Sequence, residues 1–223
     1  MRKIEAVIFD MDGLMVDSER AYYDTALEVS KTDKYKNFNI TENLILGCVG
    51  MRRVEMFDYL NEAVGNGFDA KLFNQECMIV LYEKAKTMGL KKKKGLDELL
   101  TFLKENKIKI AIASSSQIKT IKDKFIFANL DESYFDLIVS GDMVTKAKPD
   151  PEIYLKTLEK LSVNPENVFV LEDSEVGALA GISAGLKTIL IPDMKESSKE
   201  TESKVYKKLT HLGEVIDLIN NFV

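Results

Sequence analysis

The chain has 223 residues, of which 45% are hydrophobic and 30% charged, and its formal net charge is −5. These values exclude a largely disordered chain and predict a compact globule of one domain, or of one domain with a smaller insertion. They also argue against broad nucleic-acid binding, which needs excess Lys and Arg, and against a membrane span, which needs about 20 apolar residues in a row. An anionic substrate would therefore need a local positive site.

Two residue types that carry much enzyme chemistry are scarce. The two cysteines, Cys48 and Cys77, cannot build a cysteine-based zinc site or a disulfide framework, and we expect both to be small hydrophobic residues in apolar helices. Such cysteine usage fits a reducing compartment, so we expect a cytoplasmic protein. The single histidine, His211, is not accompanied by a G-x-S-x-G motif, which argues against a Ser-His-Asp hydrolase and predicts a surface residue.

Five short apolar runs rich in Val, Ile and Phe predict strands that are buried on both faces. The runs are residues 4–10, 108–114, 135–140, 167–173 and 186–191. Apolar residues at helical spacing lie between them, over 96–103, 118–127 and 153–161. Strand alternating with helix predicts an α/β fold with a doubly wound parallel sheet, a Rossmann-like core, in which ligands bind beyond the carboxyl ends of the strands.

One stretch interrupts this alternation. Residues 17–88 show helical patterns without a convincing strand, so we expect a core of 1–16 and 89–223 that carries an all-helical insertion the size of a small cap domain. The run Lys91–Lys94 that follows could hold phosphate, but a solvated linker is the favoured interpretation. The polar tail at 195–208 predicts an exposed loop and a surface helix.

Carboxylates follow the first and the fourth predicted strands. Asp10 and Asp12 come directly after a wholly apolar run, with Gly13 allowing a sharp turn. Glu172 and Asp173 end the fourth strand in the same way. Crowded carboxylates at a sheet edge are costly unless a cation compensates them, and a hard ion such as Mg²⁺ prefers oxygen ligands. Glycines spaced four apart follow the fourth strand, and we interpret them as structural: Gly177, Gly181 and Gly185.

Hydroxyl groups and a lysine follow the second and third strands. Ser114, Ser115 and Ser116 could form a phosphate cradle, although serines at this place could equally cap a helix. Lys148 precedes Pro149, which biases its backbone to an extended geometry and could aim its ammonium inward toward a phosphate. Acids with a metal, hydroxyls and one ammonium together suit a phosphoryl group. One aspartate could then act as a nucleophile and a second could move a proton.

The four strand ends resemble the four motifs of the haloacid dehalogenase-like hydrolase superfamily. The motifs are D-M-D-G-L-M-V-D-S-E, I-A-S-S-S, K-P-D-P-E-I-Y and L-E-D-S-E-V-G, and they span essentially the whole chain. Their combination is similar to the branch of β-phosphoglucomutases and sugar-phosphate phosphatases. The resemblance implies a Rossmann-like core, and it implies that residues 17–88 are a helical cap that closes over the substrate and selects it.

The resemblance also implies roles for the acidic residues. Asp10 would be the nucleophile, and Asp12 would be the general acid/base and lend its backbone carbonyl to Mg²⁺. Asp173 would bind Mg²⁺, with Glu172 at or near the metal. Asp12 argues against true dehalogenase chemistry, because a leaving halide needs no proton.

The phosphoryl group would be bound by the remaining motif residues. Ser114 would contact its oxygens, aided by the amides of Ser115 and Ser116, and Lys148 would bridge nucleophile and phosphate.

Two departures from the mutase pattern favour net hydrolysis. Tyr22 or Tyr23 stands near the place of the histidine that mutases carry in the cap. The segment 46–53 reads L-G-C-V-G-M-R-R where mutases resemble G-x-S-R. Arg52 or Arg53 could still contact a substrate phosphate, and a solvated arginine at a helix start is equally compatible with the sequence.

The sequence thus predicts a Mg²⁺-dependent phosphatase that acts on a small phosphorylated metabolite, a sugar phosphate, through an aspartyl-phosphate intermediate. Two alternatives stay open: a hexose-phosphate mutase similar to β-phosphoglucomutase, and a non-catalytic metabolite-binding protein that keeps the fold. We expect neither a nucleic-acid nor a membrane partner. The sequence does not specify which phosphorylated metabolite is the substrate. It also leaves the oligomeric state open, and a monomer is compatible with the sequence.

Overall fold

The computed structural model describes residues 3–51 and 53–222, without the side chain of residue 53. The chain divides into two compact units, one formed by Met1–Asp17 with Lys91–Val223 and the other by Ser18–Leu90. The predicted boundaries were 1–16 with 89–223 and 17–88. The function of the helical unit as a cap stays a prediction.

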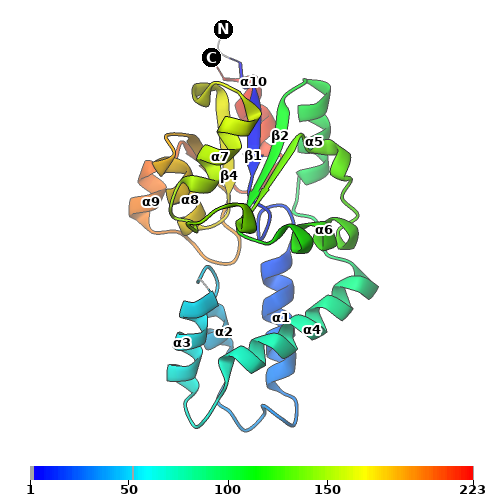
Figure 1. Cartoon of the computed structure of the whole chain (residues 1–223), viewed down its shortest axis with the longest axis vertical. Helices are drawn as coiled ribbons and strands as arrows, with labels where there is room; N and C mark the ends of the chain where they lie inside the picture. The colour runs from blue at the N-terminus through cyan, green and yellow to red at the C-terminus, as the bar shows by residue number, and fades with distance from the viewer. Residues whose placement is uncertain (1–2, 52, 223) are drawn as a thin grey trace. The chain divides into compact units, whose positions relative to one another are not determined.

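The first unit contains a parallel six-stranded sheet in the order β3-β2-β1-β4-β5-β6 (Figure 1). The strands are β1 (Ala6–Phe9), β2 (Lys109–Ser114), β3 (Leu137–Ser140), β4 (Val168–Glu172), β5 (Lys187–Leu190) and β6 (Lys207–Lys208). Each of the five predicted apolar runs contains one of the first five strands, and the predicted α/β fold with a doubly wound parallel sheet is confirmed. This strand order places a topological switch beside β1, where ligands bind in such sheets.

The register of the strands sets the geometry at the carboxyl edge of the sheet. Phe9 at the end of β1 lies opposite Ile112 of β2 and Leu171 of β4. The backbone N–H of Asp10 then donates to the Leu171 carbonyl at 3.0 Å. The residues that follow these three positions therefore leave the sheet side by side, although they come from distant parts of the sequence.

Helices cover both faces of the sheet, which explains why the strands are apolar throughout. On one face α7 and α8 pack on alternate strand residues such as Ile8 and Val170. On the other face α5 contacts β2, and α10 packs against α5. The helices of this unit are α5 (Leu96–Glu105), α6 (Ile118–Phe127), α7 (Glu152–Leu161), α8 (Glu175–Ser183), α9 (Lys199–Lys204) and α10 (Glu214–Asn220), with short 3-10 turns η1 (Glu132–Tyr134), η2 (Gly141–Met143) and η3 (Pro165–Asn167).

The second unit is helical and has a core of its own. Its helices are α1 (Ser18–Ser30), α2 (Glu42–Gly47), α3 (Arg53–Val64) and α4 (Ala70–Met88). Tyr35 packs edge-on against Phe73, with ring centroids 5.0 Å apart, in a cluster that also contains Phe68. Tyr22 donates a hydrogen bond of 2.8 Å to Asn74 Oδ1, which ties α1 to α4. The unit thus holds its helices together by aromatic packing and buried polar contacts.

Four local predictions differ from the structure. Leu155 belongs to the apolar pattern over 153–161, yet its side chain is exposed on α7. The edge strand β6 lies in the tail at 195–208, where only a loop and a helix were predicted. His211 is partly buried, and Cys48 caps the C-terminal end of α2, whereas Cys77 lies within α4 as expected.

Among the described residues, no helix combines the length and the apolar character needed to span a bilayer.

Candidate active site

Asp10 is the first residue after β1 and is almost completely buried, with 7% of its surface exposed. The turn that follows depends on Gly13, whose φ of +80° lies in the left-handed region. A Cβ atom at Gly13 would overlap Asp173 Oδ2. Glycine is therefore required here both for the backbone conformation and for the close approach of β1 to the carboxylate that follows β4.

Lys148 brings a buried positive charge to this group of acids. Its Nζ donates to Asp10 Oδ1 and to Glu172 Oε1, both at 2.6 Å, and to the Ala113 carbonyl at 3.0 Å. Burial lowers the pKa of Lys148, but the nearby carboxylates of Asp10 and Glu172 raise it more, so that it stays well above its ordinary value. Lys148 is therefore a fixed cation that links the ends of β1, β2 and β4.

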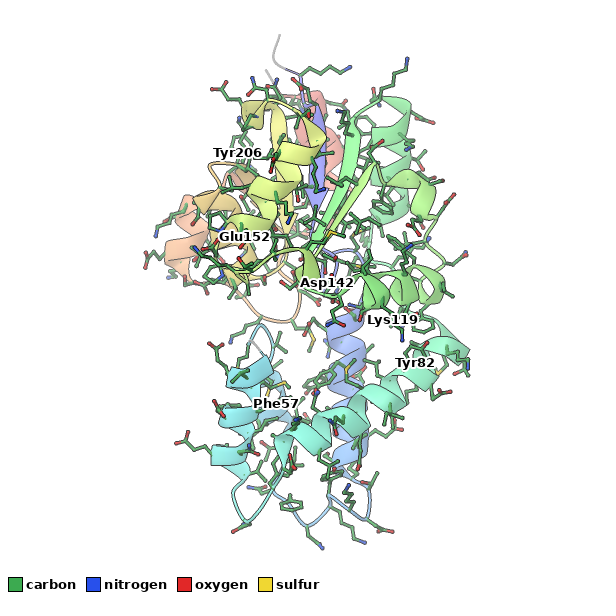
Figure 2. All side chains as sticks on the ribbon, in the orientation of Figure 1. Phe57, Tyr82, Lys119, Asp142, Glu152 and Tyr206 are labelled. Atoms are coloured by element: carbon green, nitrogen blue, oxygen red, sulfur yellow. The ribbon has the colours of Figure 1, made fainter. Side chains whose placement is uncertain are left out.

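The loop that carries Lys148 is itself held by a carboxylate. Glu152, at the start of α7, accepts hydrogen bonds from the backbone N–H groups of Thr145 at 2.9 Å and Lys146 at 2.8 Å. Figure 2 labels Glu152 together with Asp142, which lies on the turn after β3. Asp142 accepts a hydrogen bond of 2.5 Å from Ser140 Oγ. These contacts fix the segment between β3 and α7, which reduces the freedom of the lysine that it presents.

Glu172 is fully buried at the end of β4, and its oxygens accept hydrogen bonds from three side chains. Besides Lys148, the hydroxyl of Tyr154 donates to Oε1, and Ser174 Oγ donates to Oε2 at 3.3 Å. The ring of Tyr154 also lies beneath the ammonium, with Lys148 Nζ 5.0 Å from its centroid. Burial, followed by the Glu172 carboxylate, raises the pKa of Tyr154 well above its ordinary value, so the phenol stays a donor. The sequence reasoning did not identify Tyr154 as a site residue.

The acidic residues of the site can hold a metal ion. One carboxylate oxygen each from Asp10, Glu172 and Asp173 lies within 4.8 Å of the others. Burial, and then the carboxylates of Glu172 and Asp12, raise the pKa of Asp10 to about 7 in spite of Lys148, which lowers it. An added cation would offset this crowding of negative charge. An oxygen-only donor set of this kind fits a hard divalent ion.

Asp12 lies on the loop after β1, and its carboxylate is bound by the β2–α6 segment. Ser116 Oγ donates to Asp12 Oδ2 at 2.9 Å, and Lys124 of α6 forms an ion pair with Asp12 Oδ1. The Asp12 carboxylate is not part of the three-residue group described above. The predicted use of its backbone carbonyl as a metal ligand stays a prediction.

The three serines after β2 have different surroundings. Ser114 is fully buried, and its Oγ accepts a hydrogen bond of 3.1 Å from the backbone N–H of Ser116. Ser115 is exposed, and its carbonyl lies so near Gly141 that a Cβ there would overlap it. In this structure the Ser116 amide thus has a partner within the loop, whereas its hydroxyl contacts Asp12.

A third lysine, Lys93, connects segments next to the acidic group. Lys93 Nζ forms ion pairs with Asp17 at 2.9 Å and with Asp193, which follows β5. Asp193 Oδ2 is buried and accepts no hydrogen bond from any residue that the structure describes. Lys93 belongs to the Lys91–Lys94 run for which a solvated linker was favoured. Lys92 and Lys93 are partly buried instead, whereas Lys91 and Lys94 are exposed.

Comparison with known proteins identifies the family. Residues 7–191 match the model of the family described as haloacid dehalogenase-like hydrolase. The chain belongs to this family. The resemblance inferred from the four motifs is thereby confirmed, as is the prediction of an enzyme of the haloacid dehalogenase-like superfamily with a Rossmann-like core.

Several known proteins are similar to this chain over most of its length. A protein from Thermotoga maritima named phosphorylated carbohydrates phosphatase is 38% identical over 83% of this chain and 84% of its own length. Hexitol phosphatase B from Escherichia coli is 28% identical over 86% of this chain and 85% of its own. A crystal structure from Thermotoga maritima, provisionally named a beta-phosphoglucomutase, is 32% identical with a TM-score of 0.80 and covers 98% of this chain and 100% of that one.

The residues predicted from the family motifs lie in the first unit, with one exception. The structure brings together Asp10, Lys148, Glu172 and Asp173, and places Asp12 and Ser116 in contact with each other. The exception is Arg52, which lies outside the described residues. Lys124 was not predicted because it lies within α6, away from any strand end. Asp193 was also missed, although it stands two residues after the apolar run 186–191, where the rule applied to the other strand ends could have found it.

Proposed function

We propose that this member of the family is a Mg²⁺-dependent phosphatase that hydrolyses a small phosphorylated metabolite, a sugar phosphate, through an aspartyl-phosphate on Asp10. The observation that carries the proposal is the convergence of Asp10, Lys148 and the Asp173 carboxylate at the carboxyl edge of the sheet. The names of the phosphatases that are similar over most of the chain support the class of substrate. The buried cysteines, which are unpaired, fit the expected cytoplasmic location.

Asp10 is the nucleophile in this proposal. One of its carboxylate oxygens attacks phosphorus, the ester P–O bond breaks, and the leaving oxygen keeps the electron pair of that bond. Lys148 contacts Asp10 Oδ1, so its ammonium holds the carboxylate in place and offsets the negative charge of the incoming phosphoryl group. Ser114, at the end of β2, would complete the contacts to the phosphoryl oxygens.

Asp12 moves the protons. In the first step the protonated carboxyl gives its proton to the leaving oxygen, which departs as an alcohol. In the second step the carboxylate takes a proton from a water molecule that attacks phosphorus, and the Asp10–phosphorus bond breaks to release inorganic phosphate. Its position one residue beyond Met11, on the loop after β1, keeps this carboxylate near the nucleophile but outside the three-residue acidic group.

Asp10, Glu172 and Asp173 would hold Mg²⁺, assisted by the Asp12 carbonyl. When bound, the ion offsets negative charge on the phosphoryl oxygens and on the crowded carboxylates. Tyr154 and Ser174 would support the metal site indirectly. Their hydroxyl groups donate hydrogen bonds to Glu172 and so fix the orientation of its carboxylate.

We propose that the helical unit Ser18–Leu90 is the cap that selects the substrate. Its separate aromatic core supports this function, since a unit that folds around its own core can change position as one body. The two arginines at 52 and 53 remain candidates for contacts with the substrate, where either could bind a phosphate or a hydroxyl group.

The test is the release of inorganic phosphate from p-nitrophenyl phosphate and from a panel of sugar phosphates, with and without Mg²⁺. Asp10→Asn should abolish release, because the amide is too weak a nucleophile to form the intermediate. Asp97→Asn is a matched control, since Asp97 has a side chain that is 65% exposed and lies on α5. Undiminished release by Asp10→Asn would overturn the mechanism, and retained metabolite binding without turnover by the unmodified chain would favour a non-catalytic binding protein.

A hexose-phosphate mutase is the second candidate, favoured by the 32% identity and TM-score of 0.80 to the structure provisionally named a beta-phosphoglucomutase. Tyr22 argues against it, because a tyrosine stands near the place of the expected cap histidine and its hydroxyl is bonded to Asn74. Phosphorus NMR with β-glucose 1-phosphate separates the two activities. A phosphatase produces inorganic phosphate, whereas a mutase produces glucose 6-phosphate.

A further inference from the structure

Asp193 is a largely buried acidic residue that the mechanism above does not use. It lies on the loop after β5, and its side chain is 14% exposed. One oxygen, Oδ1, is bound by Lys93, whereas Oδ2 is buried and accepts no hydrogen bond from any of the residues described. A buried carboxylate oxygen that lacks a donor is costly, so a structure retains one only where something else compensates it.

The surroundings of Gly13 show where this oxygen points. A Cβ atom built on Gly13 would overlap Asp173 Oδ2 and would lie 3.4 Å from Asp193 Oδ2. Asp193 Oδ2 and Asp173 Oδ2 therefore face the same small volume beside the turn after β1. Asp173 belongs to the group whose carboxylate oxygens lie within 4.8 Å of one another, so Asp193 borders that group without being a member of it.

Lys93 fixes the direction of the Asp193 carboxylate. Its Nζ contacts Asp193 Oδ1 and also Asp17 Oδ1, the latter at 2.9 Å. The lysine backbone is anchored as well, since its N–H donates to the Met15 carbonyl at 2.9 Å. Lys93 thus holds Asp193 Oδ1 in place and leaves Oδ2 directed at the volume beside Gly13.

We propose that Asp193 is a positioning residue for the metal: its Oδ2 accepts from the hydration shell of a divalent cation held by Asp10, Glu172 and Asp173. Mg²⁺ usually keeps several water molecules in proteins, and their hydrogens need acceptors. Such outer acceptors change metal affinity by about 10- to 100-fold when they are removed. The proposal rests on the Mg²⁺ site of the proposed function, and it adds a residue to that site that no family motif of the sequence contains.

The test is Mg²⁺ binding without substrate, measured by isothermal titration calorimetry because the chain has no tryptophan for a fluorescence signal. Asp193→Asn removes the negative charge and exchanges one carboxylate oxygen for an NH₂ donor, at nearly constant side-chain volume. We expect Mg²⁺ affinity to fall about tenfold. Asp17→Asn is the matched control, because it removes the other carboxylate bound by Lys93 and should change the affinity by less than about twofold. Competition with Mn²⁺, followed by electron paramagnetic resonance, gives an independent readout.

A third variant separates this inference from the metal site itself. Asp173→Asn removes a proposed ligand and should abolish measurable Mg²⁺ binding. If the unmodified chain does not bind Mg²⁺, the metal-dependent function fails. If the unmodified chain binds Mg²⁺, Asp173→Asn does not, and Asp193→Asn binds as tightly as the unmodified chain, only the proposal for Asp193 is overturned.

Folding of the variants is monitored by circular dichroism and urea unfolding. Should Asp193→Asn fail to fold, Asp193→Ser provides the same loss of the carboxylate with a smaller side chain. The expected decrease in Mg²⁺ affinity is the same for both. An affinity equal to that of the unmodified chain in a folded Asp193→Ser variant would overturn the proposal.

Discussion

Lys124 Nζ forms an ion pair with Asp12 Oδ1, although 112 positions separate the two residues in the sequence. Lys124 lies in the last turn of α6, and its side chain reaches back to Ser116 before the start of the helix, the direction that helical Cα–Cβ bonds favour. Ser116 Oγ donates to the other oxygen of Asp12 at 2.9 Å, and Lys124 Nζ lies 3.2 Å from Ser116 Oγ. Both carboxylate oxygens of the proposed acid/base are thus held from the β2–α6 side.

Replacing this lysine should impair proton delivery. We expect Lys124→Met to lower kcat/KM for an alkyl phosphate by about 10- to 100-fold, because a misplaced catalytic group costs that much. The decrease for p-nitrophenyl phosphate should be smaller, since nitrophenolate leaves with little need of a proton. Steady-state kinetics on the two substrates measure the difference. Lys122→Met, at an exposed position of the same helix, should behave like the unmodified chain. Equal decreases for both substrates would show that Lys124 does not act through Asp12.

Removing the hydroxyl of Tyr154 should destabilise the fold. Tyr154→Phe keeps the ring but takes one donor from the fully buried Glu172 carboxylate. We expect a loss of about 1–3 kcal/mol in the free energy of unfolding, measured by urea denaturation. Tyr206, labelled in Figure 2, is exposed, so Tyr206→Phe should change stability by less than about 0.5 kcal/mol. Equal effects of the two substitutions would contradict the importance of the Tyr154 hydrogen bond.

Gly177 should not tolerate a methyl group. A Cβ atom at Gly177 would overlap the carboxylate of Glu172, which cannot retreat because Lys148 and Tyr154 hold it. Alanine favours helices over glycine by about 1 kcal/mol, but overpacking costs about 1–3 kcal/mol, so we expect Gly177→Ala to be destabilised and to bind Mg²⁺ less tightly. Urea unfolding and calorimetry measure the two effects. Ser183→Ala, at an exposed position of α8, is the control, and unchanged properties of Gly177→Ala would show that Glu172 has room to move.

The two thiols should be unreactive in the folded chain. Burial raises the pKa of Cys48 to about 11, and burial together with Glu76 raises the pKa of Cys77 to about 12. Because the thiolate is the reactive form, a disulfide reagent at pH 8 should label the native protein much more slowly than the urea-unfolded protein. Equally fast labelling in both states would contradict the burial of these side chains.

The same thiols give stability a pH dependence of known sign. Between pH 9 and about 11, thiols ionise in the unfolded chain but keep their protons in the folded one, so unfolding releases protons. The stabilisation by protonated thiols is fully present below pH 9 and is lost as the pH rises toward the folded pKa values. We therefore expect urea unfolding to show a steeper loss of stability from pH 8 to 10.5 for the unmodified chain than for a Cys48→Ala/Cys77→Ala variant. Parallel pH profiles would contradict this expectation.

Much of the fold is predictable because local hydrophobic patterns in the sequence indicate its strands and helices. Apolar runs mark the strands, and parallel strands deliver the residues that follow them to one edge of the sheet. Asp10, Lys148 and Asp173 could be found in this way, since each follows or leads a recognisable element. β6 could not be found, because a strand of two lysines that pairs along one side has no apolar pattern.

The supporting residues depend on tertiary register and were therefore missed. Tyr154 stands beside Ile153 in an amphipathic helix, where nothing in the sequence distinguishes a hydroxyl bonded to Glu172 from ordinary packing. Asp193 and Lys93 are 100 positions apart in the sequence. Lys93 is also one of four consecutive lysines, and the sequence does not indicate which of them forms a buried ion pair. Such contacts become visible only when the loops are placed.

Asp10 and Lys148 are separated by 138 positions, and Glu172 and Asp173 come later still. During synthesis Asp10 therefore leaves the ribosome long before its cationic and acidic neighbours exist. A nascent chain that ends before β4 contains β1 and Asp10 but lacks the strand that pairs with β1 on that side. It also lacks Glu172 and Asp173, so it cannot assemble the acidic group. The proposed site should consequently form late and all at once, when β4 docks beside β1 and brings Glu172 and Asp173 next to Asp10.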